Sequence, residues 1–147
     1  MKTIKYVMML AVLFIVAGAF SSCDKDVDPD VDAKQNYWIE ISLSNPGSLS
    51  ATGQQTFSDL VEEVVYGGGA HFSMYCTESY AKNNFQAVIT SMTPSSDFAK
   101  NVVQPTIAAG GASNFEFTIT LSREDGEDTK TQLASHTFSA ASLILAE

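Results

Sequence analysis

The chain has 147 residues, the length of one ordinary domain, and leaves no room for a second folding unit of normal size. Apolar residues make up 45% and charged residues 17%, so the chain is too apolar to stay disordered and should form a compact core. Its 8 Lys and Arg against 17 Asp and Glu give a net charge of −9, which offers no basic surface to phosphates. Nucleic-acid binding is therefore excluded as a function.

The N-terminus has the pattern of an export signal. Lys2 and Lys5 precede an uncharged, almost wholly apolar run over residues 6–20, and small residues then lead into Cys23. This order is typical of a secretory signal peptide, here over residues 1–22. A membrane-spanning helix is the alternative, but the apolar run would reach only about 22 Å, less than the roughly 30 Å of a bilayer core.

Residues 20–23 read Phe-Ser-Ser-Cys and resemble a lipobox, with Phe20 where Leu is commonest. The acidic residues that follow, to residue 32, are similar to the start of Bacteroidota-type surface lipoproteins. The resemblance covers residues 1–32 only. It implies a lipid on Cys23 and a place in the outer membrane facing outward, with a periplasm-facing anchor as the alternative. Without the lipid, the chain would be a soluble secreted protein.

Residues 23–35 are predicted to form an acidic tether, since five acids at alternate positions repel each other and keep the segment extended. The spacing invites comparison with a calcium loop. That match fails because Pro29 stands where the loop needs Gly, and Gln35 where it needs Glu. Residues 36–147 are then expected to form a single globular domain.

Residues 36–44 alternate between apolar and polar side chains and predict a half-buried strand. Trp38 and Glu40 fall on its polar side. An outward Trp is a candidate sugar-stacking platform or partner hot spot, and Tyr75 could share that surface. Two alternatives remain: a helix or loop covers this side and makes Trp38 part of the core, or Trp38 is an isolated exposed aromatic residue with no role.

An apolar stripe at helical spacing predicts a helix over residues 56–65, after a polar loop that ends at Gln55. Thr56 and Asp59 resemble a capping box at its start. The run Gly67-Gly68-Gly69 should end the helix, because a phosphate-binding glycine loop would precede a helix and not follow one.

Alternation over residues 70–77 predicts a second strand, with Cys76 a small buried hydrophobic residue and not a reactive thiol. The segment Phe85–Met92 fits a strand after an Asn83-Asn84 turn, but it also fits a helix. The β-branched pair Val88-Ile89 favours the strand.

The C-terminal half is predicted to hold a short helix from residue 94 closed by Pro105, a loop over residues 108–113 and a strand over 114–122. An Asp125-Gly126 hairpin turn should lead to a return strand. The return strand covers residues 129–138 with a bulge beside Leu133, and residues 142–146 could add a last strand. The expected fold is α+β: an antiparallel sheet of four to five strands with two helices packed on one face.

No group of residues in the sequence predicts catalysis. His71 and His136 lack ligands at zinc spacing, and Ser135 and His136 point to opposite faces of one strand. The carboxylate pairs Glu62-Glu63 and Glu124-Asp125 are expected to be solvated, which gives no raised pKa for acid catalysis. We therefore expect no enzyme, no metal and no cofactor, and a hydrolase only if the fold buries a pair of acids.

The resulting hypothesis is a lipid-anchored binding or accessory protein of the cell envelope, such as a subunit of an outer-membrane nutrient-capture complex. Its expected partners are the membrane, through the lipid on Cys23, and an envelope protein. A structural or adhesion component of the cell surface is the alternative, which an unprotected last strand would favour because a free sheet edge offers unpaired backbone groups.

Overall fold

The computed structural model describes residues 33–69, 71–127 and 129–144. They form one antiparallel sheet in the order β2-β1-β3-β4. In chain order the strands are β1 (Gln35–Asn45), β2 (Phe72–Cys76), β3 (Glu116–Gly126) and β4 (Thr129–Ser139). The expected α+β class with an antiparallel sheet is confirmed, with four strands. Cys23 and the predicted signal peptide lie outside the described residues.

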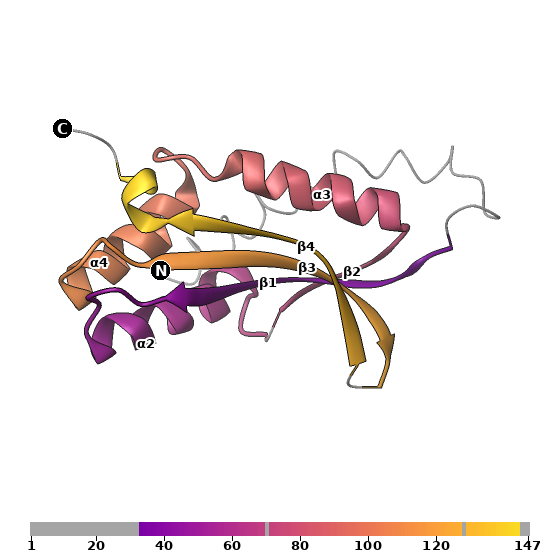
Figure 1. Ribbon diagram of the computed structural model, residues 1–147, viewed down its shortest axis with the longest axis horizontal. Helices are drawn as coiled ribbons and strands as arrows, with labels where there is room; N and C mark the ends of the chain where they lie inside the picture. The colour runs from indigo at the N-terminus through magenta and orange to yellow at the C-terminus, as the bar shows by residue number, and fades with distance from the viewer. Residues whose placement is uncertain (1–32, 70, 128, 145–147) are drawn as a thin grey trace.

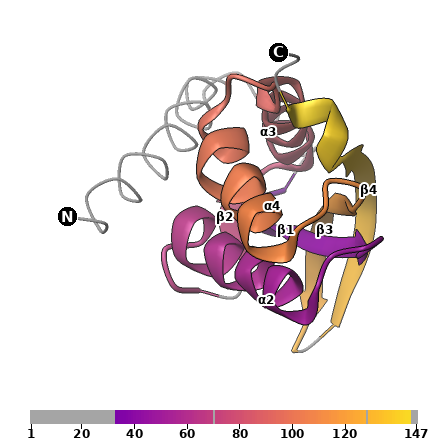
Figure 2. The same cartoon turned by 90° about the vertical axis from the view of Figure 1, so that its left-hand side faces the viewer.

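Three helices cover one face of this sheet, where two were expected (Figures 1 and 2). They are α2 (Ala51–Leu60), α3 (Glu78–Ser91) and α4 (Gln104–Gly110). A wider π-helical turn, η2 (Val61–Val65), continues α2, and a second one, η3 (Ala99–Val103), leads into α4. Among the described residues, no helix lies on the opposite face of the sheet (Figure 2).

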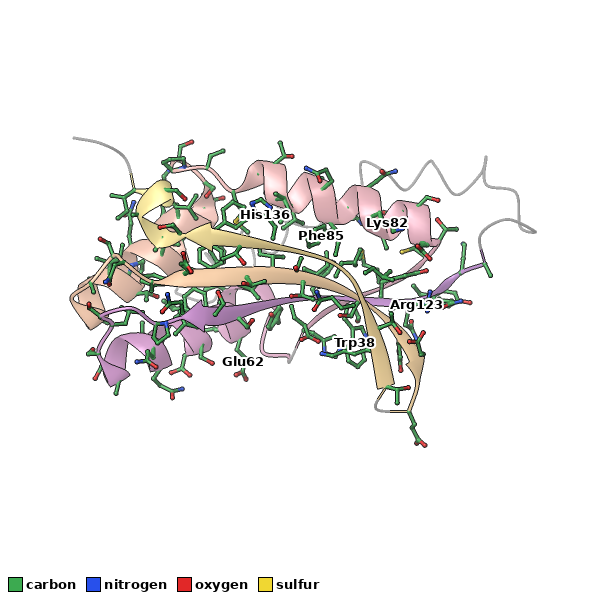
Figure 3. All side chains as sticks on the ribbon, in the orientation of Figure 1. Trp38, Glu62, Lys82, Phe85, Arg123 and His136 are labelled. Atoms are coloured by element: carbon green, nitrogen blue, oxygen red, sulfur yellow. The ribbon has the colours of Figure 1, made fainter. Side chains whose placement is uncertain are left out.

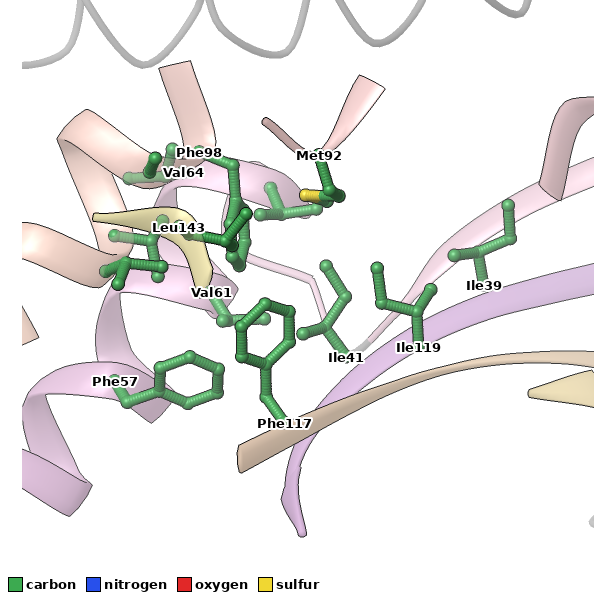
Figure 4. Close-up of a cluster of buried hydrophobic side chains, with 14 of the residues drawn as sticks. Ile39, Ile41, Phe57, Val61, Val64, Met92, Phe98, Phe117, Ile119 and Leu143 are labelled. Atoms are coloured by element: carbon green, nitrogen blue, oxygen red, sulfur yellow. The ribbon is translucent and has the colours of Figure 1, made fainter. Parts of the chain in front are cut away.

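The core lies between the sheet and the helices (Figure 4). Alternate residues of β1 and β3 point into it, as the sequence predicts. The large hydrophobic side chains that are fully buried are Tyr37, Phe57, Val64, Val102, Val103, Phe115, Phe117, Ile119, Leu121 and Leu143. Cys76 is buried, as predicted.

Helix α2 begins five residues before the predicted start at Thr56. Ser50 caps it, since its hydroxyl oxygen accepts a hydrogen bond from the Gly53 N–H at 3.2 Å. Residues 51–55 have the composition of a polar loop because four of them are exposed and the buried one, Gly53, has no side chain to extend the apolar stripe. At the far end Gly67 and Gly68 adopt positive φ angles, so the glycine run ends the helix as expected.

The preference for a strand over Phe85–Met92 is wrong, because this segment lies in helix α3 and the coil after it. The Thr77 hydroxyl caps the helix by accepting from the Tyr80 N–H at 3.3 Å. The helical stripe that includes Ala81 and Phe85 packs on the sheet, and this burial outweighs the strand preference of Val88-Ile89. Asn83-Asn84 therefore lies inside a helix and makes no turn.

Pro105 does not close a helix, and residues 108–110 are helical where a loop was expected. Pro105 occupies the first turn of α4, after the π-helical turn η3. At this position of a helix the missing backbone N–H costs no helical hydrogen bond. Helix α4 ends at Gly111, whose φ is 72°.

The hairpin turn lies two residues after the predicted Asp125-Gly126 turn, because Gly126 already pairs with Thr129. The bulge is confirmed. Leu121 pairs with Ala134 and Ser122 with Gln132, which leaves Leu133 as the extra residue. Residues 140–143 form a 3₁₀ turn, η4 (Ala140–Leu143), so no strand begins at residue 142; residues 145–147 lie outside the description.

Candidate functional site

The helix-free face of the sheet carries all three residues that the sequence singled out for a surface: Trp38, Glu40 and Tyr75. Strand pairing sets Trp38 opposite Ser73 and Asn36 opposite Tyr75, so Tyr75 is the diagonal neighbour of Trp38. The same face holds a largely polar surface of Ser and Thr, and the Thr118 and Thr137 hydroxyls are 2.8 Å apart on it.

Trp38 is neither part of the core nor a free platform. Its ring stacks on the His71 ring, with centroids 4.1 Å apart and planes 21° from parallel. The Lys130 Nζ lies 5.4 Å from the centre of the Trp38 ring and 2.6 Å from the Glu40 Oε1. The expectation that a helix or loop buries Trp38 in the core is wrong, because β1 turns this side chain away from the helices. His71 and Lys130 leave the ring half-buried.

Tyr75 is the most exposed large hydrophobic side chain of the described residues, at 69%. It stands at a hollow of about 710 Å³, at the end of the sheet where β1 begins, β2 ends and the β3–β4 hairpin bends (Figure 1). Apart from Tyr75, the lining is polar or glycine: Gln35, Asn36, Arg123, Glu124, Asp125 and Gly126.

The hairpin side of this hollow is held by charged side chains. The Arg123 Nε donates to the Asp125 Oδ1 at 2.7 Å, and the Thr131 hydroxyl donates to the Asp125 Oδ2. Thr131 first and Arg123 second lower the pKa of Asp125, and the bond to Asp125 raises the pKa of Arg123. Both groups therefore stay charged at neutral pH, and Arg123 and Asp125 contribute a positive and a negative charge to the lining of the hollow.

Sequence reasoning missed Arg123, Asp125 and Lys130 as site residues, since the segment was interpreted as a solvated hairpin end. The Asp-Gly pair indicated a turn but not that the hairpin bends back toward β1 (Figure 3). Lys130 and Glu40 are 90 residues apart in the chain, and no local pattern connects them.

A second hollow, of about 410 Å³, lies between β1 and α2 with its extension η2. Tyr66, just after η2, reaches across to β1: the Ile41 N–H donates to the Tyr66 hydroxyl at 2.5 Å, and the hydroxyl is 3.4 Å from the Ile41 carbonyl oxygen. Burial raises the pKa of Tyr66 to about 12, and the nearby Glu40 carboxylate adds to the effect.

The raised pKa of Tyr66 predicts a loss of stability in alkali. Below pH 10 the phenol is neutral in both states; as pH rises from 10 to about 12, only the unfolded chain gives up this proton. We expect the free energy of unfolding of the wild type to fall over this interval more steeply than that of Tyr66→Phe, as measured by urea denaturation. An equal fall in the two proteins would contradict the assignment.

Within the described ranges, no group of three or more His, Cys, Asp or Glu side chains could hold a metal ion, and no helix is long and apolar enough to span a membrane. His136 lies on the exposed last strand, with its ring 4.6 Å from that of Phe138. Glu62 and Glu63 are exposed, as predicted. Comparisons with protein families, curated proteins and solved structures find no match to this chain.

Proposed function

We propose that this protein is a lipid-anchored binding or accessory protein of the cell envelope, with the Tyr75 hollow as its binding site. The observation that carries the proposal is the 69% exposure of Tyr75 on a wide, open hollow whose other lining residues are polar or glycine. An exposed aromatic ring of this kind costs little entropy to immobilise and often anchors a partner or ligand.

The chemistry of the hollow favours a ligand with one flat apolar side and many hydroxyl groups, as a saccharide has. The Tyr75 ring supplies a stacking surface. The amides of Gln35 and Asn36 and the Arg123-Asp125 pair supply donors and acceptors. A saccharide ligand agrees with a role in nutrient capture.

The position of the hollow favours an accessory role beside a membrane protein. It is built on Gln35, the first residue of β1. If Cys23 carries a lipid, the intervening residues reach at most about 40 Å. The hollow is then at the tethered end of the domain, within reach of a transporter in the same membrane.

The proposal is tested by copurification of the C-terminally tagged chain from membranes in mild detergent. We expect a stoichiometric envelope partner with the wild type and with Ser73→Ala, a matched control on the same face of β2. Tyr75→Ala should recover about five- to thirtyfold less of it, the effect of losing an aromatic anchor worth 1 to 2 kcal/mol. Cys23→Ala should not reach the membrane fraction. Equal recovery with Tyr75→Ala and Ser73→Ala would overturn the assignment of the hollow.

A structural or adhesion role is the second candidate, favoured by the last strand. β4 is an edge strand of eleven residues, and most of its side chains are exposed. A free edge of this length offers unpaired backbone groups to another chain. In the copurification experiment, this role predicts recovery of a self-assembled species without another protein.

A further inference from the structure

Strand β1 extends beyond its neighbour β2. The pairing of β1 with β2 runs from Gln35 opposite Cys76 to Ile39 opposite Phe72 and goes no further. On its other side, β1 stays paired with β3 to Asn45. From Glu40 to Asn45 this edge of β1 therefore has no strand partner among the described residues, although β1 lies inside the order of the sheet.

Tyr66 takes the place of a strand partner at one residue of this edge. The Ile41 N–H and carbonyl are both within hydrogen-bond distance of the Tyr66 hydroxyl, at 2.5 and 3.4 Å. Since backbone groups alternate in direction along a strand, the N–H and carbonyl of Leu43 point to the same side. No side chain among the described residues hydrogen-bonds to them there. Along this edge, Ile41 is hydrogen-bonded to a side chain, whereas the backbone groups of Leu43 have no hydrogen-bond partner among the described residues.

The open edge is one wall of the 410 Å³ groove, and α2 with η2 forms the other. Leu43, Phe57 and Val61 give this groove an apolar floor. Two charged residues line the groove, Glu40 and Glu62, and the Glu40 carboxylate is already paired with the Lys130 ammonium at 2.6 Å, which leaves the negative charge of the groove to Glu62. Glu62 is exposed, and it lies on the helix side of the groove (Figure 3). The groove therefore combines backbone groups, an apolar floor and negative charge.

We propose that this groove binds an extended, basic peptide segment of a partner protein, added to the sheet as a strand in line with β2. The peptide backbone would hydrogen-bond to Leu43 and displace the Tyr66 hydroxyl from Ile41. One of its apolar side chains would pack on the apolar floor of the groove, and a Lys or Arg would lie near Glu62. Strand addition of this kind derives affinity from the backbone and specificity from alternate side chains. A second copy is disfavoured as occupant because each chain carries a net charge of −9.

The probe for this site is a labelled, end-capped peptide Lys-Val-Thr-Val-Thr-Val-Lys, titrated into the full chain in mild detergent at low salt with anisotropy as the readout. Tyr66→Phe removes the competing hydroxyl, so it should tighten binding about 3- to 10-fold. Glu62→Lys should weaken binding about fivefold or more. The matched control Glu63→Lys makes the same charge change one residue away, outside the groove lining, and should bind within about twofold of wild type.

Two further peptides and one mapping measurement decide the mode of binding. A peptide with Glu in place of Lys, and one N-methylated at alternate residues, should each bind at least about tenfold more weakly. Hydrogen exchange should slow at the Leu43 amide when the first peptide is bound. The proposal is overturned if the N-methylated peptide binds equally well, if Glu62→Lys and Glu63→Lys behave alike, or if protection appears on β4 instead. A dimer in which Leu43 is protected without peptide would make a second copy the occupant.

Discussion

Phe117→Ala is expected to lower the free energy of unfolding by about 3 to 5 kcal/mol, the usual cost of removing a buried Phe ring. Phe117 is fully buried near the start of β3. Its ring meets those of Phe57 at 5.7 Å, Phe98 at 5.3 Å and Phe138 at 5.5 Å. These three partners come from α2, the segment before η3, and β4. Removing the ring therefore leaves a cavity where helices and sheet meet, which no single element can fill.

Urea denaturation of the purified protein measures this effect, with Thr118→Ala as the matched control. Thr118 is the next residue of the same strand, but its side chain lies on the helix-free face, so its replacement should cost about 1 kcal/mol or less. If the two variants lose similar amounts of stability, Phe117 is not the centre of the core.

Gly53→Ala is expected to destabilise the protein by at least about 2 kcal/mol, although alanine is the better helix former by about 1 kcal/mol. Gly53 lies in the first turns of α2 and faces Gly110 at the end of α4. A methyl carbon at Gly53 would stand 2.4 Å from the Gly110 Cα and 2.9 Å from the Leu49 Cδ2. Because the nearest of these atoms is backbone, it cannot rotate away, and the two helices would have to separate.

Thermal and urea unfolding test this prediction against Thr52→Ala, an exposed substitution one residue earlier in the same helix. Thr52→Ala should be neutral or slightly stabilising, since only helix propensity changes. A stabilising Gly53→Ala would mean that α2 and α4 do not approach at this point.

The candidate site was predictable in part. Alternation along β1 placed Trp38 and Glu40 on one polar face because side chains of a strand alternate whatever the strand pairs with. Whether Tyr75 shares that face was left open, because it depends on the register between β1 and β2. Alternation could not place Lys130 on the Trp38 ring or Arg123 in the lining of the same hollow as Tyr75, because both depend on how far the β3–β4 hairpin bends. Nor could it show that β2 is shorter than β1, which leaves the edge at Leu43 open.

The sequence by itself determined the properties that repeat along a few residues: the inward faces of β1 and β3, the apolar stripe of α2, the glycine stop after it and the bulge at Leu133. These follow from the local backbone, whose period is two in a strand and 3.6 in a helix. Only the tertiary structure decided that residues 85–91 are helical, that Pro105 begins a helical segment and that Gly53 meets Gly110. Those outcomes depend on the free energy of burying one segment against another that is distant in sequence. A local sequence pattern carries no information about that free energy.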